Sequence, residues 1–197
     1  MATRTKRIVL IALIVIVLIV VAAAAYYYGR IVPLINAGKQ EGTYSSESAR
    51  PSVAGFGFEI GKGVHQTIAD LKGKVVVVDV WATWCGTCIY TIPEIVALRD
   101  KYPEEDVAII GLDVDDEGWK KVKPFLQKHP EMNYTIAVPS PAPSFLLQSL
   151  VDLKPLGKVS AIPTVFVVDR KGKLAGKFIE TGHAKEIDDL VAKLLDE

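Results

Sequence analysis

Hydrophobic and polar positions divide the 197-residue chain into a purely apolar N-terminal segment and a long stretch where short apolar runs alternate with polar ones. The segment Ile8–Ala25 has no charged residue and would extend about 27 Å as a helix, close to the roughly 30 Å hydrocarbon core of a bilayer. None of its faces is polar, which excludes a helix packed on a soluble core. Basic residues precede it and tyrosines follow it, a pattern typical of a membrane span whose N-terminus is cytoplasmic.

We therefore expect residues 1–30 to form a single-pass anchor in the cytoplasmic (inner) membrane, with residues 8–28 in the bilayer and the C-terminal domain on the extracytoplasmic, periplasmic side. The alternative is a cleaved signal peptide, because the alanines before Tyr26 offer a cleavage site. The apolar run is, however, longer than the usual signal-peptide core of about 7–15 residues. Both interpretations export the rest of the chain. Residues 31–52 are polar and contain Gly, Ser and Pro, which predicts a linker to a domain over residues 53–197.

The exported part alternates predicted strands and helices. Residues 75–80 and 107–115 are apolar runs too continuous for edge strands, and they predict central strands buried on both faces. Residues 163–180 predict a hairpin with Gly172 at its turn. The other predicted elements are a hairpin within 55–74, helices over 85–101, 117–130, 143–154 and 184–197, and a strand over 134–138. This order predicts an α/β three-layer sandwich, a central mixed sheet flanked by helices.

Charge and cysteine content narrow the functional classes. The first 30 residues hold four of the 23 basic groups and none of the 23 acidic groups, so the other 167 carry a net charge of −4. A balance of that kind gives no electrostatic reason to expect nucleic acid as a partner. Two cysteines in the whole chain are too few for a scaffold stapled by disulfide bonds.

Both cysteines lie together in the sequence VVVVDVWATWCGTC, as Cys85 and Cys88. A structural staple is a weak explanation, because closing a loop of about four residues stabilises a fold by only about 2 kcal/mol. A zinc site is two ligands short, since the three histidines are scattered singly, and we expect no metal. A strand that feeds a helix at Cys85 favours thiol–disulfide exchange instead. The helix N-terminus stabilises the thiolate of Cys85, the attacking nucleophile, and Cys88 resolves the mixed disulfide.

The motifs DVWATWCGTC and AIPT together resemble those of the thioredoxin superfamily, over about residues 53–195. The N-terminal anchor and an insertion before the proline are similar to its membrane-tethered TlpA/ResA-like branch. The resemblance implies a thioredoxin-like fold and a cis-proline at Pro163, which packs beside the cysteine pair and leaves the preceding backbone free to pair with a substrate strand. The candidate substrate-binding residues are then Trp84, Ile162 and Thr164, of which Thr164 is also interpreted as structural.

The resemblance also explains an acid in the apolar run VVVVDV. Asp79 lies six residues before Cys85, where thioredoxins have a buried aspartate that moves the proton of the resolving thiol. Desolvation raises the pKa of such an acid and suits it to general acid–base work. The alternative is an acid that a neighbouring hydroxyl satisfies. Two departures from thioredoxin matter. Gly111 aligns with a thioredoxin lysine, which leaves the tuning of Asp79 open. Gly86-Thr87 stands where thioredoxin itself has Gly-Pro, and because these two residues set much of the reduction potential in this family, the direction of electron flow is open.

We therefore expect an extracytoplasmic thiol–disulfide oxidoreductase with no cofactor besides its redox-active disulfide. By resemblance, it reduces disulfides of exported proteins, with apocytochrome c before haem attachment as one candidate, and takes electrons from an integral-membrane donor. Three alternatives remain. A disulfide-forming oxidase runs the same chemistry backward and differs in reduction potential. A thiol peroxidase needs a peroxidatic cysteine in a Pro/Thr-bearing loop, and a copper-handling module typically has a longer cysteine spacing.

Two further features are interpreted as structural. His183 follows the last predicted strand, where the chain in related folds passes near the active site, so one interpretation is that it modulates the thiolate. We favour the alternative, a surface histidine near the start of the last helix. The acidic run DVDDE, residues 113–117, lacks the glycine and the distal glutamate of an EF-hand loop and is interpreted as a solvated strand end.

Overall fold

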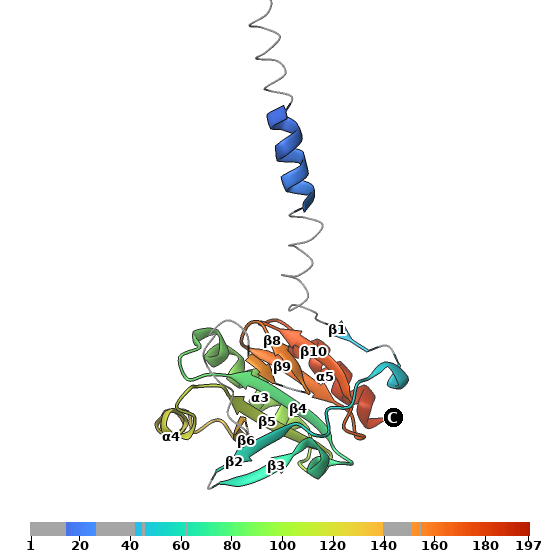
Figure 1. The fold of residues 1–197 in the computed structure, drawn as a ribbon. Helices are drawn as coiled ribbons and strands as arrows, with labels where there is room; N and C mark the ends of the chain where they lie inside the picture. Colours follow the sequence, from blue (N-terminus) through green and yellow to red (C-terminus); the bar gives the residue numbers. More distant parts are fainter. Residues whose placement is uncertain (1–14, 27–41, 45, 62, 140–150, 154) are drawn as a thin grey trace, which may run out of the picture. The chain divides into compact units, whose positions relative to one another are not determined.

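A computed structural model of the chain describes residues 15–26, 42–44, 46–61, 63–139, 151–153 and 155–197 (Figure 1). The chain divides into two compact units, residues 1–40 and residues 41–197. In the first unit, residues 15–26 form a helix whose valine, leucine and isoleucine side chains are exposed. Among the residues that the structure describes, no helix is both long and apolar enough to cross a membrane. Residues 8–14 and 27–28 of the predicted span lie outside the described residues.

The second unit is built on an eight-stranded mixed sheet in the order β1-β10-β9-β4-β5-β6-β2-β3. Strands β4, β5 and β6 run parallel, and the pairs β4·β9, β9·β10, β6·β2, β2·β3 and β1·β10 are antiparallel. The strands of this sheet are β1 (Gly42–Thr43), β2 (Gly57–Ile60), β3 (Val64–Thr67), β4 (Val75–Trp81), β5 (Val107–Asp113), β6 (Thr135–Pro139), β9 (Thr164–Val168) and β10 (Leu174–Ile179).

Helices cover both faces of this sheet. The helical elements are η2 (Glu47–Ala49), η3 (Ile68–Leu71), α3 (Gly86–Lys101), α4 (Trp119–Lys128) and α5 (Ala184–Leu195). On one face, α3 and α5 pack against Val75 and Val77 of β4. On the other face, η3 contributes Ile68 to the core around Val76 and Val78, and Phe125 of α4 packs against the same core. The predicted three-layer α/β architecture is confirmed.

The apolar runs that predicted central strands are the most buried parts of the domain. Every residue of β4 and of β5 is buried, including the acids Asp79 and Asp113. The predicted hairpins are confirmed as β2–β3 and β9–β10, and Gly172 has a φ of 75° at the β9–β10 turn. A continuous β-branched run therefore identified the centre of the sheet correctly, because both of its faces are covered.

The helix predicted over residues 143–154 is wrong where it can be compared. Residues 143–150 and 154 lie outside the described residues, and Val151–Leu153 forms β7, which pairs with β8 (Gly157–Val159) as a separate antiparallel hairpin. Leu153, Leu156 and Val159 are buried in the core that also contains the two cysteines. A short apolar stretch can form a buried hairpin as well as a helix, so the spacing of its apolar residues did not distinguish the two.

The polar lead-in predicted as a linker is docked on the domain over its described part. Strand β1 pairs with β10 at the sheet edge (Figure 1), and the Arg50 guanidinium is buried against Asp169 at 3.0 Å and Glu197 at 2.6 Å. Its pKa is raised above its already high usual value, first by the hydrogen bond with Glu197. The lead-in is held by partners more than 100 residues away, which its own composition could not indicate.

Candidate active site

The two cysteines form a disulfide bond at the N-terminus of α3, with an Sγ–Sγ distance of 2.03 Å. Cys85 is the cap residue immediately before the helix, which begins at Gly86. The Cys85 Sγ accepts a hydrogen bond from the backbone N–H of Cys88 at 3.2 Å, and the Thr87 hydroxyl lies 3.4 Å from it. Because a helix N-terminus favours negative charge, a thiolate formed at Cys85 on reduction is stabilised by these groups.

Two tryptophans precede the disulfide and lie in opposite environments. Trp81 is buried, and its ring packs 5.0 Å from the Phe125 ring. Trp84 is 71 % exposed beside the two buried cysteines, and Tyr90 on the first turns of α3 is 82 % exposed. The structure thus places an exposed aromatic surface next to the disulfide, a feature typical of a surface that binds another chain.

The loop before β9 lies against the disulfide. The Ile162–Pro163 peptide bond is cis, as the resemblance implies, and the Ile162 carbonyl oxygen lies 3.8 Å from the Cys85 Sγ. The Pro163 carbonyl accepts the backbone N–H of Glu180 at 2.8 Å. Thr164 is fully buried, and its hydroxyl donates to the Ala161 carbonyl at 2.6 Å. Thr164 therefore shapes the turn, while Ile162 lies beside the sulfur.

Asp79 is buried in the middle of β4, with only 3 % of its surface exposed. Side chains alternate along a strand, so Asp79 shares the face of Val75 and Val77, which α3 and α5 cover. Its Oδ1 has no hydrogen-bond partner among the described residues. Burial, and then the charge of Glu94 on α3, raise the pKa of Asp79 to about 7. A carboxyl group with that pKa can accept and release a proton near neutral pH.

The strand beside Asp79 has no room for a side chain at the position that aligns with a thioredoxin lysine. Gly111 is the register partner of Asp79 in the parallel pair β4·β5. A Cβ at residue 111 would lie 2.8 Å from the Tyr134 ring and 2.9 Å from the Ile136 side chain. The Tyr134 ring therefore occupies the space beside Asp79. The Tyr134 hydroxyl is buried without a partner among the described residues, and its pKa is raised, first by burial and then by Asp79.

The acidic residues at the end of β5 were misinterpreted from the sequence. Asp113 and Asp115 are buried, so the interpretation of residues 113–117 as a solvated strand end is wrong for both. The Asp115 Oδ2 accepts the backbone N–H of Thr83 at 2.7 Å, and the Asp115 N–H donates to the Asp113 Oδ1 at 3.1 Å. Burial, and then the neighbouring carboxyl of Asp115, raise the pKa of Asp113 to about 9. The pair therefore holds the loop that carries Cys85.

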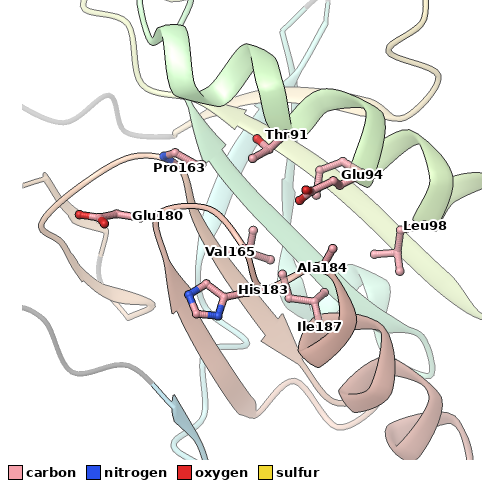
Figure 2. A pocket seen from close by; sticks show the side chains of 11 residues that line it. Thr91, Glu94, Leu98, Pro163, Val165, Glu180, His183, Ala184 and Ile187 are labelled. Carbon is pink, nitrogen blue, oxygen red and sulfur yellow. The ribbon is translucent and has the colours of Figure 1, made fainter.

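The sequence contained a signal for this pair. Asp113 ends an otherwise apolar strand, and the argument about a buried acid that applies to Asp79 applies to it as well. His183 lies at the start of α5, as predicted, and is half-buried. His183 caps α5 and lines a recess beside Pro163, together with Glu94 and Glu180 (Figure 2). No group of three or more His, Cys, Asp or Glu side chains within the described ranges could hold a metal ion.

A cysteine pair at a helix N-terminus, a cis-proline loop against the first sulfur and a buried acid on the helix-covered face define a thioredoxin-fold thiol–disulfide oxidoreductase. Residues 49–194 match the family model described as Redoxin, and the chain belongs to this family, as a TlpA/ResA-like member of the thioredoxin superfamily.

Named relatives agree with this class. The chain is 30 % identical over 135 residues to the thiol-disulfide oxidoreductase ResA of Bacillus cereus, covering 68 % of this chain and 70 % of the relative. It is 29 % identical over 135 residues to the thiol:disulfide interchange protein DsbE of Pseudomonas aeruginosa, covering 66 % and 67 %. A secreted thiol-disulfide isomerase of Corynebacterium glutamicum has the same fold, with a TM-score of 0.63 at 22 % identity over 81 % of this chain and 94 % of that structure.

Proposed function

We propose that this oxidoreductase reduces disulfide bonds of exported proteins on the extracytoplasmic side of the cytoplasmic membrane. The observation that carries the proposal is the cysteine pair at the N-terminus of α3. The Cys85 sulfur accepts a hydrogen bond from the Cys88 N–H, and the Ile162 carbonyl oxygen lies 3.8 Å from it. Resemblance to the TlpA/ResA-like branch supports the reductive direction and makes apocytochrome c one candidate substrate.

The reaction proceeds in two exchanges. The thiolate of reduced Cys85 attacks one sulfur of the substrate disulfide, which forms a mixed disulfide and releases one substrate thiolate. Cys88 then loses its proton and attacks the Cys85 sulfur, which releases the second substrate thiolate and leaves the Cys85–Cys88 disulfide. Asp79 is the proposed proton acceptor for Cys88, because it is a buried carboxyl whose Oδ1 has no hydrogen-bond partner among the described residues and whose pKa is about 7. Trp84 and the backbone at Ile162 and Pro163 are the proposed substrate contacts.

Each turnover leaves the protein oxidised, so two electrons must come from outside. We propose an integral-membrane donor, and an anchor through residues 8–28 that keeps the domain beside it. No cofactor is needed, since the dithiol itself holds the two electrons.

Extraction of membranes at alkaline pH tests the anchor. The full chain is expected to stay in the membrane fraction, and a chain without residues 1–30 is expected to leave it; release of both would contradict the anchor.

The reduction potential tests the direction. We would equilibrate the full chain in thiol buffers of defined potential and count the thiols, with Cys88→Ser as a control that cannot form the internal disulfide. A value at or below about −250 mV, near that of thioredoxin, supports a reductant. A value above about −150 mV, toward the strong oxidant DsbA, would make the protein a disulfide-forming oxidase.

A further inference from the structure

A recess lies directly beside the proposed substrate loop. It is bordered by α3, by Pro163 and Val165 at the start of β9, and by the turn from β10 into α5 (Figure 2). Its volume is about 30 Å³, room for about two water molecules. Figure 2 shows Glu94 reaching from α3 toward the recess and His183 on the opposite side, while Glu180 lies at the outer rim with its carboxylate directed away from Glu94. Nothing in the reaction described above uses these three side chains directly.

The recess is lined by acidic side chains, Glu94 and Glu180, and by no lysine or arginine. Within the described part of the chain, neither carboxylate has an ion pair or a side-chain hydrogen bond. Asp79 adds a third acid nearby, since it is the register partner of Val165, which lines the recess. Because the lining has carboxylates and no lysine or arginine to balance them, the recess favours a bound cation.

The walls of the recess are apolar. Ile95 and Leu98 of α3 line it opposite Ile187 of α5. Lysine and arginine side chains combine an aliphatic stem with a cationic head, and they bury the stem along apolar surface while the head meets polar groups. The small recess therefore suits the end of such a side chain, to which its apolar wall and its carboxylates are complementary in polarity and charge.

The distance to the disulfide fixes where this side chain would lie in a substrate. Glu94 is nine residues beyond Cys85 along α3, which corresponds to about 13 Å of helix. An extended chain covers that distance in about four residues. The start of the recess at Pro163 adjoins Ile162, whose carbonyl lies 3.8 Å from the Cys85 sulfur. A strand that presents its cysteine to Cys85 could thus reach the recess with a nearby side chain.

We propose that this recess binds a lysine or arginine side chain of the substrate, within about four residues of the cysteine that is reduced. The inference rests on the proposed reduction of protein disulfides, and it makes Glu94 and Glu180 determinants of substrate specificity. A bound cation also acts on the chemistry. Glu94 contributes to the raised pKa of Asp79, so a cation beside Glu94 lowers that pKa and increases the fraction of Asp79 able to accept the Cys88 proton.

Peptides of matched sequence test the recess. Each peptide carries one cysteine as a mixed disulfide with glutathione and has Lys, Gln or Glu four residues from it, on either side. The reduced full-length protein is mixed with each peptide, and the second-order rate constant is followed by tryptophan fluorescence. We expect a Lys-over-Glu preference of about tenfold at low salt, since each exposed charge pair contributes a few-fold. The preference should shrink in 0.5 M salt, because exposed charges are screened.

The variant Glu94→Gln/Glu180→Gln is expected to reduce the preference to about twofold, with the two single variants in between. The matched control is Glu104→Gln/Glu105→Gln, which removes the same charge from exposed glutamates beyond the C-terminus of α3 and should keep the preference. Equal rates for the Lys and Glu peptides, or an equal loss of preference in the control, would overturn the proposal. Absence of exchange even with the Gln peptide would overturn the proposed function and this inference together.

Discussion

Asp79 and Asp113 are buried acids on neighbouring strands, and their surroundings differ. Asp79 lies in mid-strand with one carboxyl oxygen that has no partner among the described residues, and burial is the first cause of its raised pKa. Asp113, at the end of β5, also has one oxygen, Oδ2, without a partner among the described residues, and burial is again the first cause of its raised pKa. Its Oδ1, however, accepts the Asp115 N–H, and the Asp115 carboxyl accepts the Thr83 N–H. One acid is isolated, and the other belongs to a network.

The difference shows that burial and a raised pKa do not by themselves identify a catalytic acid. A networked carboxyl holds backbone in place, because its hydrogen bonds are satisfied only in one arrangement. An isolated buried carboxyl destabilises the fold whenever it is charged, and it fixes no loop. We therefore assign proton transfer to Asp79 and positioning of the Thr83–Cys85 loop to the Asp113–Asp115 pair. Four substitutions, in order of decreasing expected effect, test this assignment.

The largest effect is expected from Asp79→Asn. Without the proton acceptor, the rate of substrate reduction near pH 7 should fall about 100-fold, the usual scale of general acid–base catalysis. The variant should also differ from the wild type in how its free energy of unfolding depends on pH. The folded wild type keeps its Asp79 proton up to pH about 7, whereas an unfolded chain releases it near pH 4. The contribution of Asp79 to the free energy of unfolding therefore falls by about 4 kcal/mol as pH rises from 4 to above 7. The variant lacks this part of the loss and keeps the part that comes from Asp113.

Stopped-flow exchange and guanidinium unfolding of the oxidised protein between pH 4 and pH 8 measure the two effects. Asp116→Asn is the matched control, because Asp116 is an exposed acid beside the Asp113–Asp115 pair, and its curve should parallel the wild type. If Asp79→Asn and Asp116→Asn gave the same pH dependence of stability, Asp79 would not be an isolated buried acid.

Asp115→Ala should lower the free energy of unfolding at pH 7 by about 2 kcal/mol, because the Thr83 N–H loses its acceptor. Asp115→Asn keeps a carbonyl oxygen at the same place and should recover much of the loss. Chemical denaturation measures both. Substrate reduction should slow several-fold in the alanine variant, since the loop next to Cys85 loses an anchor. Wild-type stability and rate in Asp115→Ala would show that the pair does not position the loop.

The sequence predicted the centre of this molecule better than its edges. Residues 75–80, 107–115 and 163–180 formed the expected strands because both faces of the central sheet are covered, and a continuous apolar run is then unambiguous. The cysteine pair and Pro163 are local motifs, and the structure brings them together at the end of β4. These features depend on short stretches of chain, so they could be recognised from those stretches alone.

What could not be predicted depends on distant partners. Arg50 is fixed by Asp169 and Glu197, so the lead-in carries no local sign that it is docked. Asp115 is buried because it meets Thr83, 32 residues earlier. Glu94 lies on α3 and His183 immediately before α5, and both line the same recess. Contacts of this kind follow from the packing of the sheet and helices, and a periodicity along the chain does not contain them.

The third test asks whether packing explains why residue 111, beside Asp79, is a glycine where thioredoxins have a lysine. Gly111→Ala places a methyl group 2.8 Å from the Tyr134 ring and 2.9 Å from Ile136, and overpacking of this kind costs about 2 kcal/mol. Gly55→Ala is the control, since no atom lies within 4 Å of its added Cβ. Denaturation of the two variants measures the difference. Equal stability would mean that Tyr134 and Ile136 move aside, and that packing does not exclude a side chain beside Asp79.

The smallest effect is expected from Tyr134→Phe, which asks whether Asp79 is as isolated as the comparison requires. The Tyr134 hydroxyl is buried without a partner among the described residues. Its removal should therefore stabilise the fold by about 1 kcal/mol, the lower end of the cost of an unsatisfied buried group. The pH profile of substrate reduction should stay at the wild-type position, because the hydroxyl makes no hydrogen bond with the carboxyl. A loss of stability, together with a profile shifted to higher pH, would instead show that Tyr134 donates to the Asp79 carboxylate through water and replaces the lysine of thioredoxins.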